Sequence, residues 1–130
     1  MSQVLMMNPL LGDVLKREFD PNYNRELVTL KDGNTYPVGA VLGKVTATGE
    51  YTLSPNASTT GSEGAELACA VLLEAADASN GSVKALAVVR GPVIVGDSKL
   101  VFDASIDNHD KQVSKHQQLA AFGLVVAHTA

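Results

Sequence analysis

The sequence contains no tryptophan and only one cysteine, and aromatic residues make up 5% of its 130 positions. The single cysteine excludes an intramolecular disulfide, and it excludes a zinc site built on two or four cysteines. This residue, Cys69, stands in the apolar run of residues 67–73, which predicts a buried and unreactive thiol. With so few aromatic residues, the core has to be built from Val, Leu, Ala and Ile.

The sequence also lacks a cluster of basic residues and a long hydrophobic run. The formal net charge is -4, whereas nucleic-acid binding depends on a basic face that releases counterions from phosphates, and an anionic membrane attracts the same kind of face. No segment approaches the roughly 20 apolar residues of a membrane span. The N-terminus lacks the cationic start and the apolar stretch of a signal peptide. We therefore expect a soluble protein of a reducing cytoplasm, with no nucleic-acid or membrane partner.

Patterns that suggest chemistry are few and incomplete. Gly96-Asp97-Ser98 is similar to the start of one esterase motif, but no histidine has an aspartate three residues before it, as that family requires. His109 and His116 are seven residues apart and lack a third converging metal ligand. Carboxylates are scattered singly, so no acid–base pair can be argued. We predict that the chain is not an enzyme and uses neither a cofactor nor a metal.

Residues 1–24 differ from the rest of the chain. They are rich in apolar side chains, but Pro9 and Gly12 interrupt any continuous helix drawn through them. We interpret this segment as an arm that is mobile in solution and orders against a partner; a disordered tail is the alternative. The residues predicted to bind are Val4, Leu5, Met6, Met7, Leu10, Leu11, Val14 and Leu15.

Residues 25–130 are predicted to form one domain, which is mainly β. A hairpin is expected around Gly49, with a three-residue loop that sets Ala47 opposite Tyr51, because this register gives the ribbon one buried side. The continuous apolar run at 67–73 is typical of a strand covered on both faces. The other expected strands are residues 27–30, 36–41, 83–89, 93–95 and 124–127.

One helix is expected over residues 107–122. Ser105 or Asp107 can cap its first amides, Asp110 places negative charge near its N-terminus, and Gly123 stands where a helix C-cap glycine belongs. Its predicted apolar stripe consists of Val113, Leu119, Ala120 and Phe122.

An ordered set of motifs resembles the lambda-type phage head decoration protein family. Residues 38–53 read VGAVLGKVTATGEYTL and are followed by the loop Thr60-Gly61-Ser62. An Ala-Val-Leu strand at 70–72 and Asp77-Ala78-Ser79 come next. The end of the chain also fits, with His116, Leu119 and the Gly-Leu-Val-Val of residues 123–126.

This resemblance implies a small β-clip-like or β-barrel-like domain with one C-terminal helix and an extended N-terminal arm. It also implies a structural protein of the virion that binds as a homotrimer to the capsid exterior and stabilises the shell against internal DNA pressure. Its partner would be the major capsid protein, bound through the arm, and assembly would take place in the host cytoplasm. A small β ligand-binding module, for instance for carbohydrate, is the alternative, although the few aromatic residues offer little platform for a sugar.

Overall fold

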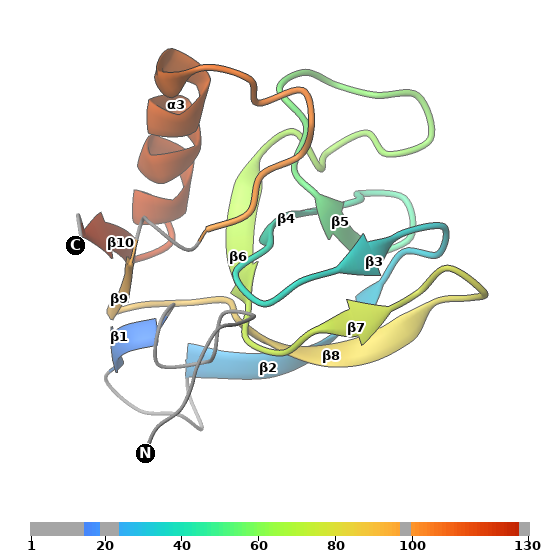
Figure 1. The fold of residues 1–130 in the computed structure, drawn as a ribbon, viewed down its shortest axis with the longest axis horizontal. Helices are drawn as coiled ribbons and strands as arrows, with labels where there is room; N and C mark the ends of the chain where they lie inside the picture. The colour runs from blue at the N-terminus through green and yellow to red at the C-terminus, as the bar shows by residue number, and fades with distance from the viewer. Residues whose placement is uncertain (1–14, 19–23, 97–99, 128–130) are drawn as a thin grey trace, which may run out of the picture.

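The computed structural model describes residues 15–18, 24–96 and 100–127, which form a closed barrel with a smaller sheet and a helix at one side (Figure 1). The barrel order is β2-β5-β4-β6-β8. A three-stranded sheet has the order β1-β9-β10, and helix α3 (His109–Ala120) contacts both β10 and β6. The barrel strands are β2 (Arg25–Leu30), β4 (Val41–Lys44), β5 (Tyr51–Leu53), β6 (Ala68–Leu72) and β8 (Val83–Val88). The remaining strands are β1 (Leu15–Glu18), β9 (Val93–Gly96), β10 (Leu124–Ala127) and the short pair β3 (Thr35–Tyr36) and β7 (Ala76–Asp77). The predicted mainly β fold with one C-terminal helix is confirmed.

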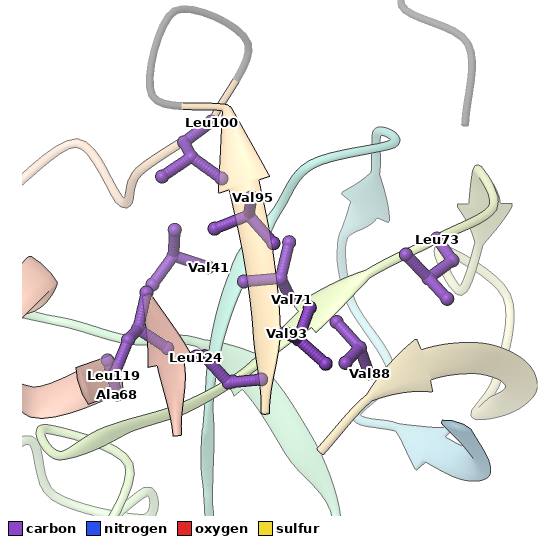
Figure 2. Close-up of a cluster of buried hydrophobic side chains, with 10 residues drawn as sticks. All are labelled: Val41, Ala68, Val71, Leu73, Val88, Val93, Val95, Leu100, Leu119 and Leu124. Carbon is purple, nitrogen blue, oxygen red and sulfur yellow. The ribbon is translucent and has the colours of Figure 1, made fainter. Parts of the chain in front are cut away.

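The core consists of two apolar clusters on opposite faces of the barrel wall. Strand β6 contributes side chains to both clusters, because successive side chains of a strand point to opposite faces. Ala70 and Leu72 belong to the cluster inside the barrel, whereas Val71 belongs to the outer cluster. Figure 2 shows this outer cluster, in which Val93, Val95, Leu119 and Leu124 join Val71. The prediction of a strand at 67–73 that is covered on both faces is confirmed, with bounds Ala68–Leu72.

The expected strand at 36–41 is wrong as a single element. It is divided into β3, which ends at Tyr36, and β4, which begins at Val41. Between them the backbone turns: Gly39 has a φ of 90°, and the Ala40 amide donates to the Pro37 carbonyl at 3.2 Å. Proline cannot donate a ladder hydrogen bond, so a break at this position follows from its chemistry.

The hairpin forms, but its predicted register is wrong. Lys44, not Ala47, lies opposite Tyr51, so the connection is six residues long. The Val45 amide donates to the Glu50 carbonyl at 2.7 Å, and the Thr46 amide donates to the Glu63 carbonyl at 2.9 Å. The longer loop therefore binds the backbone of a segment that is distant in sequence, and no pattern within the hairpin reveals that partner.

The helix begins later and ends earlier than predicted, and its C-cap is Ala121 rather than Gly123. Its N-cap is Asn108, whose Oδ1 accepts from the Lys111 amide at 2.9 Å, rather than Ser105 or Asp107. Asp107 instead pairs with the Lys111 ammonium at 2.8 Å. Asp110 lies in the first turn, as expected, and Gly123 follows the helix with a φ of 83°. The predicted stripe is only partly correct, because Leu119 is buried whereas Val113 is half-buried and Ala120 and Phe122 are exposed.

A lysine completes the buried face of the helix. Lys115 is 1% exposed, and its ammonium donates to Ser54 Oγ at 2.9 Å and to the carbonyls of Pro55 and Glu66 at 2.6 Å each. Gln118 Oε1 is a fourth acceptor at 3.3 Å. These bonds fasten the helix to residues at the two ends of the loop between β5 and β6, which we call the polar loop.

Part of the predicted arm belongs to the sheet. β1 pairs antiparallel with β9, with Leu15 opposite Val95. Asn24, the last residue assigned to the arm, is buried, and its side-chain amide donates to the Arg90 carbonyl at 2.8 Å. Residues 1–14 and 19–23 lie outside the described part of the chain.

Candidate interaction surfaces

Of the eight predicted binding residues of the arm, the structure describes only Leu15. Its side chain is half-buried and packs against the outer core cluster. Leu15, which was assigned to the predicted arm, is therefore part of the domain through β1. The other predicted binding residues lie outside the described part: Val4, Leu5, Met6, Met7, Leu10, Leu11 and Val14.

The residues considered as candidates for a catalytic or metal site are not brought together in the fold. His109 is exposed at the start of α3, and the half-buried His116 lies with its ring centroid 6.0 Å from that of Phe102. Asp97 and Ser98 fall outside the described residues. Within the described ranges, no group of three or more His, Cys, Asp and Glu side chains is placed to hold a metal ion, and no helix is long and apolar enough to cross a membrane.

A hollow of about 290 Å³ opens where several barrel strands end. Lys44 is the last residue of β4, Tyr51 is the first of β5, and Val89 follows β8. The hollow is lined by Lys44, Tyr51, Gly64, Leu67, Cys69, Val89 and Phe122. We call it the barrel-end hollow. Leu67 and Phe122 are 47% and 40% exposed, so two large apolar side chains face solvent within a concave surface.

Two titratable side chains in the lining of the barrel-end hollow, Cys69 and Tyr51, are uncharged at neutral pH. Burial raises the pKa of the Cys69 thiol, against the opposing effects of a hydrogen bond to the Lys44 backbone and of the Lys44 charge. Burial also raises the pKa of Tyr51, with smaller contributions from Cys69 and Glu26. Both groups therefore keep their protons. The prediction of a buried Cys69 is wrong in part, since the side chain is half-buried and lines the hollow.

Two further apolar side chains are exposed outside this hollow. Leu27 is 62% exposed on the outer face of β2, and Val125 is 51% exposed on β10. The sequence did not predict the exposure of either side chain, because a single leucine or valine in a strand is usually interpreted as a core residue.

The motifs behind the sequence resemblance have structural roles in this fold. A Cβ atom on Gly43 would lie 1.9 Å from the Ala65 carbonyl oxygen, so only glycine fits there. Asp77 Oδ1 accepts from the Ser79 amide at 3.0 Å and from the Ser79 hydroxyl at 2.6 Å, which closes the turn after β7. Gly123 approaches Gly91 so closely that a Cβ on it would lie 2.8 Å from the Gly91 Cα. These three motif positions therefore have roles in the fold.

Comparison with known families gives one match that covers most of the chain. The family model described as bacteriophage lambda head decoration protein D matches residues 4–124. No curated protein matches the chain.

Proposed function

Since the chain belongs to the bacteriophage lambda head decoration protein D family, we propose that it binds as a homotrimer to the exterior of a phage capsid and stabilises the shell against internal DNA pressure. The observation that carries the proposal is the family match over residues 4–124. The family is structural. The protein would act by adding contacts between capsid subunits.

The arm is the proposed contact with the major capsid protein. The family match begins at residue 4, so it includes all eight arm residues predicted to bind. Pairing of β1 with β9 joins Leu15, the last of the eight predicted binding residues, to the domain. Burial of apolar side chains contributes about 25 cal/mol per Å², from which the cost of ordering the arm is subtracted. A single arm would therefore bind weakly. Three arms on one trimer bind more tightly, because binding of the first arm raises the effective concentration of the other two at the capsid surface.

Removal of residues 1–14 tests the arm directly. This truncation keeps β1, so the thermal unfolding of the domain should stay nearly unchanged. Binding to purified heads that lack the protein should be lost, as measured by cosedimentation. Val125→Ser is the matched control, since it removes an exposed apolar side chain outside the arm and should leave binding intact. Truncated protein that binds heads with unaltered affinity would show that the arm is not the capsid contact.

A further inference from the structure

A ring of three copies requires two different surfaces on each copy. A closed trimer is held by head-to-tail contacts, in which one patch meets a second, unlike patch on the next copy; a self-complementary patch produces a dimer instead. A chain that forms a trimer should therefore carry two different surfaces that are complementary to each other.

The barrel-end hollow supplies one of these surfaces. Leu67 and Phe122 line it and remain substantially exposed, which is typical of apolar side chains that an interface core covers. Lys44 adds a positive charge at its edge. This lysine is exposed and forms no ion pair within the described ranges, so its ammonium is available to a carboxylate from outside.

The outer face of β2 and β8 supplies the other surface. Alternation along β2 directs Val28 and Leu30 into the barrel and leaves Leu27 projecting outward. Leu27 lies opposite Leu86 of β8, whose amide donates to the Glu74 carboxylate at 2.8 Å. Leu86 thus lies between the projecting Leu27 and the exposed carboxylate of Glu74, which it binds on the side that faces away from β2.

The two surfaces are complementary in charge, because Lys44 lines the hollow and Glu74 lies on the face of β2 and β8 that carries Leu27. We infer that Leu27 of one copy enters the barrel-end hollow of the next copy, with Glu74 facing Lys44. Three such contacts close a ring and cover both apolar surfaces. This inference rests on the proposed trimer and adds to it the residues that form the interface.

Two substitutions and their mixture test the contact. Leu27→Asp removes the projecting leucine, and Leu67→Asp places a charge in the hollow; each variant alone should be monomeric under conditions where the wild type is trimeric. In an equimolar mixture, the Leu67→Asp copy retains its Leu27 and the Leu27→Asp copy retains its hollow. One intact contact therefore remains per pair, and the mixture should form heterodimers. Sedimentation velocity measures the free proteins, and chemical crosslinking measures the proteins bound to heads.

The controls separate the interface from folding. Val125→Asp changes an exposed apolar residue outside both surfaces and should leave the trimer intact. Urea unfolding should be similar for the wild type and for every variant. In a test without apolar substitutions, Lys44→Glu should weaken association about tenfold, and adding Glu74→Lys should restore it.

The outcomes distinguish this inference from the proposed function. Variants that remain trimeric, or a mixture that remains monomeric, would overturn the inference while leaving the decoration role in place. If the wild type gives no crosslinked trimer on heads, the proposed trimer fails and the inference fails with it. Variants that still bind heads as monomers, through their arms, would support both.

Discussion

Lys115 contributes to stability in a way that its residue type does not suggest. Lysine is rarely buried, yet this ammonium is enclosed by the hydroxyl of Ser54 and the carbonyls of Pro55 and Glu66. Lys115 and Leu119 are four residues apart and therefore share one face of α3. The sequence could have revealed this face only if the aliphatic stem of the lysine had been counted as apolar.

Replacement of Lys115 by methionine should be strongly destabilising. The substitution preserves the apolar stem but leaves buried acceptors without a donor, which costs on the order of 3 kcal/mol in the free energy of unfolding. Lys111→Met is the matched control on the same helix, because its ion pair with Asp107 is exposed and contributes little. Urea unfolding measures both losses. Equal losses would contradict the role assigned to Lys115.

Lys115 should also make stability depend on alkaline pH. Burial lowers the pKa of Lys115 below 10.5, and the carboxylates of Glu66 and Asp103 partly oppose this shift. The pKa of Lys115 is lowered in the folded chain, whereas it is about 10.4 in the unfolded chain. Between these two pH values the unfolded chain binds more protons than the folded chain. The contribution of Lys115 to the free energy of unfolding therefore rises with pH in this range.

The measurement for this dependence is a comparison with Lys115→Met. The free energy of unfolding of both proteins is followed by urea titration from about pH 8 to about pH 10.5. The stability of the wild type relative to the variant should increase across this range. A relative stability that is constant, or that falls with pH, would contradict the predicted direction.

The secondary structure elements show which sequence patterns are sufficient to predict an element and its bounds. The apolar run at 67–73 predicted β6 because a strand buried on both faces needs such a run. The hairpin was predicted, but its register depended on the Thr46 amide bonding to the Glu63 carbonyl, a contact across 17 residues that local alternation does not contain. The helix cap was missed because Ser105, Asp107 and Asn108 can all act as caps, and only the backbone geometry selects Asn108.

The contact between β4 and the polar loop depends on a glycine. In Gly43→Ala the added Cβ would collide with the Ala65 carbonyl, so β4 or the loop must shift, at a cost of about 1–3 kcal/mol. Gly33→Ala is a control with no atom within 4 Å, where only a left-handed backbone conformation with φ of 101° opposes the change. That cost is roughly 1 kcal/mol. The loss of urea stability should be larger at Gly43, and an equal or smaller loss would contradict the close packing.

At the scale of the whole molecule, the sequence indicated the fold and the family better than it indicated the surfaces. The arm remains a prediction from apolar residues interrupted by Pro9 and Gly12, which lie outside the described part of the chain. The barrel-end hollow was not visible, because its lining residues come from separate elements between Lys44 and Phe122 and meet only after the barrel has closed. Leu27 likewise had the appearance of a core residue until the register of β2 placed it outside.

Decoration should raise the temperature at which filled heads release DNA. The physical reason is that each bound copy adds contacts that rupture of the shell must break. Release is followed with a DNA-binding dye during heating of heads with and without the protein. The truncation that lacks residues 1–14 is the control and should leave the release temperature unchanged. Identical release temperatures with and without the full-length protein would contradict the stabilising role.

The most direct test of the central claim is an image reconstruction, by electron cryomicroscopy, of heads prepared with and without this protein. We predict additional three-lobed density on the outer surface at local threefold positions of the lattice, present only when the protein is added. An outer surface that is unchanged by saturating protein would contradict the claim that it decorates the capsid.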